Sequence, residues 1–251
     1  MQPTFVRSRN VISALLLAFV AVVLLAASGS IRFLTCDLLD LQFWLSKKET
    51  ESQVVIVEID SYSLKQLDSW PFPRRYHAEL VKKIDAADPA HIFLDIDFSS
   101  KSNPEDDAYL ASTFAGLKPN KLLLPVFLQY HNSQSLKQLS LVAPLPDLKK
   151  NAQLVSVNLD PGDGLIRRIK LNNHFADIEL NALPMVFEQK PENLPEKMLI
   201  NYAIHPDSLK RVSYADVLAG NVDTTVFQNK LVIVGATALE LTDMSAVPVY
   251  K

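Results

Sequence analysis

VVIVEID, residues 54–60, is the stretch of the chain that decides the fold. A continuous apolar run of this length, rich in β-branched residues, is typical of a central strand that is covered on both faces of a sheet. A second run of the same kind, HIFLDID, follows at residues 91–97. A helical segment lies between the two runs, and the order strand, helix, strand predicts a right-handed crossover that joins a parallel pair.

The helical segment between the two strands is RRYHAELVKKIDAAD, residues 74–88. Its apolar residues recur at helical spacing, so they form one face that can pack on a sheet. These residues are Tyr76, Leu80, Val81, Ile84 and Ala87. The motif WPFP at residues 70–73 interrupts the chain with two prolines, and Pro73 suits the first turn of the helix that follows.

Further strands are predicted downstream. Apolar runs typical of strands occur at residues 121–127, 198–204 and 230–236. The segments LVSVNLD and LIRRIKL flank PGDG, residues 161–164, and this pattern indicates a hairpin. Residues 131–150 indicate a long surface excursion, because they are polar and then interrupted by prolines. The expected fold class is α/β, a single domain with a mixed β-sheet flanked by helices.

The N-terminal part of the chain carries an apolar segment without charge between Arg9 and Arg32. About 20 apolar residues are enough to cross the hydrocarbon core as a helix, so we expect a transmembrane helix over residues 11–31. Basic residues precede this segment and acidic residues follow it. The positive-inside rule therefore places residues 1–10 in the cytoplasm and residues 33–251 outside it. The alternative is a cleaved secretory signal, because small residues end the segment, and it gives the same location for the rest of the chain.

Residues 33–46, FLTCDLLDLQFWLS, come next. Their apolar positions have helical spacing, and they are Phe33, Leu34, Leu38, Leu41 and Leu45. We expect a helix here that either continues out of the membrane or caps the domain.

Charge and cysteine content exclude some classes of function. The formal net charge is −3, from 25 basic and 28 acidic residues, and three of the basic residues lie before residue 37. The rest of the chain is therefore more acidic still, which argues against binding to nucleic-acid phosphates. Cys36 is the single cysteine, so no disulfide can form within the chain.

Acidic residues stand where the two strands end, at Asp60, Asp95 and Asp97. Ligands of open α/β sheets collect at the carboxyl ends of parallel strands, so these carboxylates are candidates for binding a cation or a basic ligand group. The alternative is a structural role, in which each aspartate caps a helix or pairs with Arg74 or Arg75. Residue type alone does not separate the two roles.

DIDFS, residues 95–99, resembles the nucleophile motif of haloacid-dehalogenase-like phosphatases. In those enzymes the first aspartate attacks phosphorus and the second is an acid/base, which would be Asp95 and Asp97 here. Ser99 replaces the usual Thr or Val, and no later strand ends in the paired aspartates that hold magnesium. The histidines have no metal-ligand spacing either, so neither a metal site nor a cofactor is expected.

The signature segments taken together resemble the extracellular sensory domain called CHASE, type two. VVIVEIDSYSL and then WPFPRRYHAEL are similar to the central signature of that family, and FLDIDF to its next strand. Asp163, Gly164 and Arg167 match a D-G-x-x-R turn, and NKLVIVGATALELTDMSAVPVY, which contains Asp243, is similar to the closing strand. One departure is that Asp68-Ser69 stands where a glycine commonly precedes the tryptophan.

The resemblance implies an extracytoplasmic sensing domain of a bacterial transmembrane receptor, whose output module is a histidine kinase, a nucleotide cyclase or a diguanylate cyclase. Because the chain ends before the returning membrane helices of such receptors, the output module is expected to be absent and the chain itself not to be an enzyme. The expected partners are a small-molecule or protein ligand, the membrane and a second copy in a homodimer. The candidate ligand-binding residues are Asp60, Trp70, Arg74, Asp95 and Asp97. The competing function is the exported phosphatase described above.

Overall fold

The computed structural model describes residues 4–27, 30–46, 48–49, 53–133, 136–159, 164–187, 194–241 and 247–248. The chain divides into two compact units. The first consists of residues 1–48 with 201–203, and the second of residues 49–200 with 204–251.

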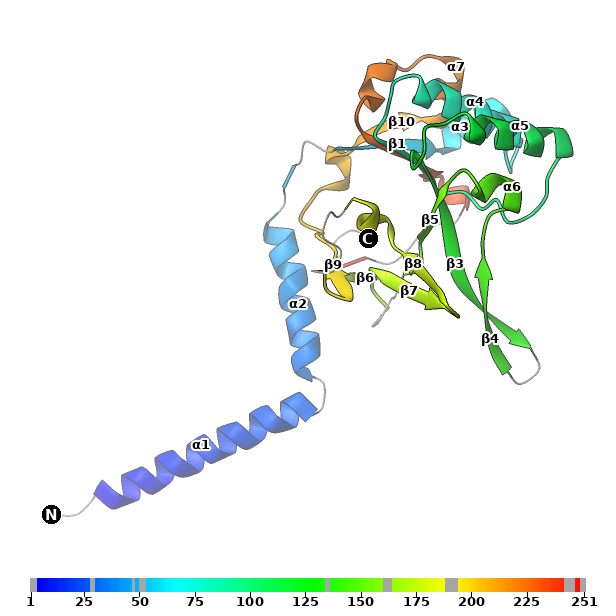
Figure 1. Ribbon diagram of the computed structural model, residues 1–251. Coiled ribbons are helices and arrows are strands. Elements are labelled where there is room, and N and C mark those ends of the chain that lie inside the picture. Colours follow the sequence, from blue (N-terminus) through cyan, green and yellow to red (C-terminus); the bar gives the residue numbers. More distant parts are fainter. Residues whose placement is uncertain are drawn as a thin grey trace. The chain divides into compact units, whose positions relative to one another are not determined.

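A seven-stranded sheet forms the centre of the second unit among the described residues (Figure 1). Its strand order is β10-β1-β11-β2-β3-β4, and β5 also pairs with β3. The strands are β1 Val54–Ile59, β2 His91–Leu94, β3 Leu122–Ser133, β4 Leu136–Val142, β5 Gln153–Ser156, β10 Lys210–Ser213 and β11 Leu231–Ala236. All pairs are parallel except β3 with β4, which is antiparallel. The prediction of an α/β fold with a mixed sheet is therefore confirmed.

The position of β11 corrects one expectation. β1 and β2 run parallel in one sheet, but they are not neighbours, because β11 lies between them. Val234 is in register with Val57 on one side and with Leu94 on the other. The apolar run at residues 230–236 thus takes a central place in the sheet, where Val232 and Val234 are fully buried.

A layer of helices covers one face of the sheet (Figure 1). These helices are α3 Ser61–Leu67, α4 Arg74–Asp85, α5 Pro104–Ala115 and α7 Tyr214–Ala219. The core between them and the sheet takes alternate residues of β1, so Val55, Val57 and Ile59 are fully buried while the residues between them are partly buried. The expectation of a strand covered on both faces thus holds in full for one face and in part for the other.

The second face of the sheet carries a smaller apolar cluster. It consists of Phe93, Leu123 and Val155, against which Leu183 and Val186 pack. The last two residues belong to the 3-10 helix η1, Leu183–Val186. The other short elements of the unit are α6 Pro146–Lys149, β6 Arg168–Lys170, β7 Asn172–Phe175, β8 Ile178–Asn181, β9 Lys197–Leu199, η3 Pro206–Ser208, η4 Thr224–Phe227 and η5 Leu239–Leu241.

Several local predictions around these short elements were wrong. Among the described residues, the two segments of the predicted hairpin do not pair with each other, because β5 pairs in parallel with β3 while β6 pairs with β9. The surface excursion predicted at residues 131–150 contains two regular elements, β4 and α6, which the sequence did not indicate. The strand predicted at 198–204 ends at Leu199. Asp163 of the D-G-x-x-R turn lies outside the described residues, as does Asp243. Gly164 of that turn has a φ of +90°, which favours glycine.

A side-chain amide extends the hydrogen bonding of β3 beyond the end of β5. The Oδ1 atom of Asn158 accepts a hydrogen bond from the backbone N–H of Leu128 at 2.8 Å. The Nδ2 atom of Asn158 donates to the Leu128 carbonyl oxygen at 3.0 Å. One asparagine thus satisfies both backbone groups of a strand residue, as a neighbouring strand would.

The first unit contains helices α1 Thr4–Ala27 and α2 Ser30–Leu45. The helical conformation expected for residues 11–31 and 33–46 is confirmed over these bounds. Among the residues that the structure describes, however, no helix is both long enough and apolar enough to cross a membrane, so the structure does not support the predicted transmembrane helix.

A buried polar contact joins α4 to α7 in the second unit. The Nδ1 atom of His77 lies 2.8 Å from the hydroxyl of Tyr214, and both side chains are buried. Burial, together with the smaller effect of the nearby positive charge of Arg74, lowers the pKa of His77 from 6.5 to about 3. His77 is therefore neutral in the folded protein at every pH above about 3.

This contact predicts an acid-sensitive stability. The unfolded chain binds a proton at His77 below pH 6.5 and the folded chain does not, so the free energy of unfolding falls as the pH drops from 6.5 towards 3. For this group alone the slope is about 1.4 kcal/mol per pH unit. Urea unfolding of the full chain should show a shallower slope for His77→Gln. The exposed His174→Gln should keep the wild-type slope, and equal slopes for all three proteins would contradict the assignment.

Candidate functional site

Asp60 is the helix cap at the carboxyl end of β1. Its Oδ1 atom accepts hydrogen bonds from the backbone N–H of Ser63 at 2.8 Å and from the hydroxyl of Ser213 at 3.1 Å. The Ser63 hydroxyl also bonds to that of Ser213 and accepts from the backbone N–H of Ala215. Asp60 therefore connects the start of α3 to the junction of β10 and α7. Of the two roles considered for this residue, ligand binding and helix capping, the structure shows the second.

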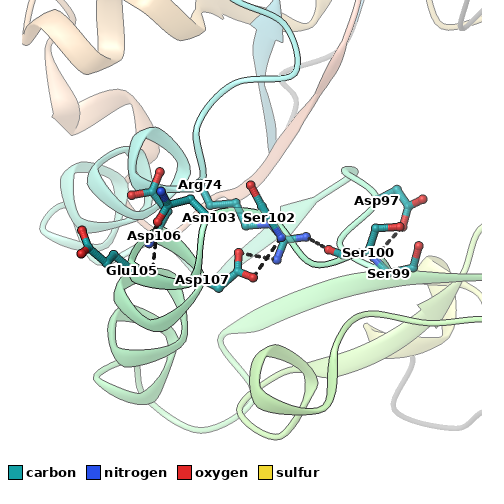
Figure 2. A network of polar contacts seen from close by, with 9 residues as sticks. All are labelled: Arg74, Asp97, Ser99, Ser100, Ser102, Asn103, Glu105, Asp106 and Asp107. Atoms are coloured by element: carbon teal, nitrogen blue, oxygen red, sulfur yellow. Dashed lines mark hydrogen bonds and ion pairs between the residues drawn. The ribbon is translucent and has the colours of Figure 1, made fainter.

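Asp95 and Asp97 follow the end of β2, and both are exposed. Asp95 lies against the neighbouring strand, since a Cβ atom added to Gly235 would be 3.5 Å from the Cβ of Asp95. The Oδ1 atom of Asp97 accepts a hydrogen bond from the backbone N–H of Ser99 at 2.8 Å, which shapes the loop between β2 and α5 (Figure 2). Asp60 and Asp95 thus follow two parallel strands at the same edge of the sheet, with β11 between those strands.

The same edge carries a further acidic residue, Glu240 of η5. Its Oε2 atom accepts a hydrogen bond from the hydroxyl of Ser61 at 2.8 Å. A backbone hydrogen bond, then this bond from Ser61, lowers the pKa of Glu240 below its usual value. Within the described part of the chain, no group of three or more His, Cys, Asp or Glu side chains could hold a metal ion.

Trp70 is half exposed and packs its ring edge on Phe72, with 5.2 Å between the ring centroids. Phe72 is buried and also contacts Tyr214 and His77. Trp70 therefore rests on the aromatic core through Phe72 and leaves about half of its own surface open.

Arg74 is a buried brace at the start of α4. Its Nη1 atom donates to Oδ1 of Asp107 at 2.7 Å, and its Nη2 atom donates to the carbonyl oxygen of Ser100. The guanidinium carbon lies 5.4 Å from the centroid of the Phe98 ring. Figure 2 shows Arg74 between the loop at Ser100 and the first turn of α5. Arg74 thus joins α4 to α5 and to the loop that carries Asp97.

The first turn of α5 has several aids to helix formation. Asn103 is the cap, and its Oδ1 accepts from the backbone N–H groups of Glu105 and Asp106, while Pro104 takes the first helical position. Arg75 binds the buried Asp106 at 2.6 Å, and this contact raises the pKa of Arg75. The second oxygen of Asp107 accepts from the backbone N–H of Ser102 at 3.0 Å (Figure 2).

A groove of about 730 Å³ lies beside this network. Small residues of α5 and apolar residues at α6 line it, and they include Ala108, Ala111, Ala115, Leu145 and Leu148. A volume of this size matches the pockets that bind small molecules in proteins.

The polar lining of the groove connects it to Arg74. Ser102 and Asp107 line the groove, and Arg74 binds Asp107 from the protein side. Two lysines, Lys101 and Lys150, line it as well, and Lys150 pairs with Asp147 at 3.2 Å. Because Arg74 compensates the charge of Asp107 and Lys150 that of Asp147, the groove offers an apolar floor with the basic side chain of Lys101 beside it.

The structure thus separates the five candidate residues. Arg74 reaches the groove through Asp107, whereas Asp60 is a cap, Trp70 rests on Phe72, and Asp95 and Asp97 lie at the end of β2. Sequence reasoning missed Lys101, Ser102, Asp107 and Lys150. The cap and acidic run NPEDD at residues 103–107 was a signal for the start of α5, but no sequence feature indicated that α6 would face it.

Comparison with known protein families gave a match for this chain. It matches the CHASE2 domain over residues 16–250, which is nearly its whole length. Comparisons with curated proteins and with solved structures gave no match. The match agrees with the resemblance carried by the strand and W-P-x-P-R segments, and CHASE2 domains are extracellular sensory domains. The chain belongs to the CHASE2 domain family.

Proposed function

We propose that this chain is the signal-sensing input domain of a bacterial transmembrane receptor with a kinase or cyclase output, and that its stimulus is a small molecule bound in the groove between α5 and α6. The groove is the observation that supports the proposal most directly. Its volume of about 730 Å³ would hold a metabolite-sized molecule, and its floor is made of alanine and leucine side chains.

The lining also defines the class of ligand. Alanines at 108, 111 and 115 leave room for an aliphatic body, and Lys101 would attract an anionic group, whereas the charge of Lys150 is compensated by Asp147. Asp107 would not repel that group strongly, since Arg74 and the backbone N–H of Ser102 occupy its two oxygens. An aliphatic carboxylate is therefore the probe that suits the groove.

Arg74 connects the groove to the rest of the domain through its contact with Asp107. A ligand that displaces α5 would strain the contacts of Arg74 with Asp107 and Ser100. Because Arg74 belongs to α4, the displacement would act on that helix directly. A ligand shifts the conformational equilibrium only by its difference in affinity for the two states. We propose that these states differ in how α5 sits against α4.

Filling the groove should abolish ligand binding without unfolding the domain. Octanoate at ten times its dissociation constant should stabilise the full chain by about 1.4 kcal/mol, which raises the melting temperature by a few degrees. Ala108→Trp should remove this shift, because Ala108 is exposed and its new side chain would occupy the groove. Ala86→Trp, at the exposed end of α4, is the matched control and should retain the shift. A shift that survives in Ala108→Trp would place the ligand elsewhere.

We also propose that Asp95 and Asp97 have no catalytic role and that the chain is not itself an enzyme. The turn made by Asp97 with Ser99 supports a structural role for that carboxylate. Incubation of the full chain with p-nitrophenyl phosphate and Mg²⁺ should give no turnover above background. Turnover that Asp95→Asn abolishes would instead favour the phosphatase alternative.

We propose that the second unit lies outside the cytoplasm, in the periplasm or at the cell surface, attached to the membrane through the N-terminal segment. The support comes from the charge pattern around residues 11–31 and from the family of extracellular sensory domains. It does not come from the helices of the structure, because none among the described residues meets the requirements of a membrane span. Alkaline phosphatase fused after Lys251 should be active in bacteria, and β-galactosidase fused there should be inactive. The reverse pattern would refute the proposed location.

A further inference from the structure

The antiparallel hairpin of β7 and β8 is attached to the central sheet through one of its faces (Figure 1). On this face Asn173 and Leu180 are opposite each other, and both are buried. The Nδ2 atom of Asn173 donates a hydrogen bond to Oγ of Ser156 in β5 at 3.0 Å. Successive side chains of a strand point to opposite faces, so the residues on either side of this buried pair belong to the other face of the hairpin.

Four side chains with metal-ligating atoms share that other face. The register places Asn172 opposite Asn181 and, two residues along the strands, His174 opposite Glu179. His174 and Glu179 are exposed, whereas the two asparagines are partly buried. The Cβ atoms of directly opposite residues are about 5 Å apart, and the next pair on the same face lies about 7 Å along the strands. One small area of the surface therefore combines an imidazole, a carboxylate and two amide groups.

The two asparagines provide the observation that points to a ligand. The Oδ1 atoms of Asn172 and Asn181 are both buried, and neither accepts a hydrogen bond within the described part of the chain. A buried acceptor without a partner costs stability, so such atoms are rare in native proteins. An amide oxygen has no hydrogen to donate, so the two oxygens cannot satisfy each other. They call for a cation or a hydrogen-bond donor that both can approach.

We propose that this face of the β7–β8 hairpin binds a divalent transition-metal ion. Its ligands are the imidazole of His174, the carboxylate of Glu179 and the Oδ1 atoms of Asn172 and Asn181. The imidazole decides the class of metal, because Ca²⁺ and Mg²⁺ prefer oxygen ligands alone, whereas Zn²⁺ accepts imidazole nitrogen together with carboxylate oxygen. The inference goes beyond the proposed sensing of a small molecule and does not depend on the groove or on its ligand.

The strand register explains why neither sequence spacing nor the acidic clusters indicate this site. Its single histidine has no second histidine at metal-ligand spacing, since the other ligands come from both strands of the hairpin. Half of its ligands are amide oxygens, so it is not one of the His, Cys, Asp and Glu clusters that are absent from the described residues. The bond of Asn173 to β5 holds the hairpin in place, which favours a preformed site.

Calorimetric titration of the full chain with Zn²⁺ tests the site. A Cys36→Ser background removes the single thiol, which would compete for zinc, and this chain should bind one Zn²⁺. His174→Gln and Asn181→Leu should each weaken binding at least tenfold, because each removes one ligand. His205→Gln is the matched control, since it removes a histidine that also lies beside a carboxylate, that of Asp207 at 3.5 Å, and it should keep the background affinity.

The melting temperature gives a second readout on the same proteins. Zn²⁺ should raise it for the background chain, because the metal binds the folded state, and should not raise it for Asn181→Leu. Without metal, Asn181→Leu should melt no lower than the background, since the oxygen that it removes has no partner. Urea unfolding without added metal does not involve this site, so His174 stays a valid control for His77.

Three results would overturn the proposal. The first is an affinity for Zn²⁺ that is unchanged in His174→Gln or equally weakened in His205→Gln. The second is Ca²⁺ binding as tight as Zn²⁺ binding, which would contradict the role of the imidazole. The third is a background chain that binds no Zn²⁺, which would leave the two amide oxygens to water alone.

Discussion

The parallel pairing of β11 between β1 and β2 is the constraint on which the rest of the domain depends. Val232 and Val234 of β11 are fully buried, and each is in register with an apolar residue on both neighbouring strands. Residues 231–236 lie far from both neighbours in the sequence, so the sheet cannot be completed from local contacts. Folds built from such distant pairings lose more chain entropy before they gain burial, and they fold more slowly than local ones.

Once the sheet is complete, a few polar contacts set the positions of the helices on it. Asp60 connects α3 to the β10–α7 junction, His77 connects α4 to α7, and Arg74 connects α4 to α5. Apolar burial supplies most of the stabilisation but little direction, whereas hydrogen bonds to buried groups require defined geometry. The shape of the groove between α5 and α6 depends on this arrangement, because the contact of Arg74 with Asp107 holds the first turn of α5 in place.

The sequence predicted local features well and distant pairings poorly. The two signature strands, α4 and the strand at 230–236 follow from β-branched runs and helical spacing, and all are found close to the expected bounds. The place of β11, the pairing of β5 with β3 and the existence of β4 depend on contacts between distant residues, which periodicity does not encode. The same holds for the site: the sequence left open whether Asp60, Asp95 and Asp97 bind a ligand, cap helices or pair with Arg74 or Arg75. The fold makes Asp60 a cap and gives Arg74 a different partner, Asp107.

The amide of Asn158 has a consequence for how molecules of this protein meet one another. A strand that continues past its neighbour displays open N–H and C=O groups, and such groups readily recruit a strand from another molecule. At Leu128 both groups are already occupied by one side chain. Asn158 therefore closes a position at which β-sheets of separate chains could otherwise join edge to edge and aggregate.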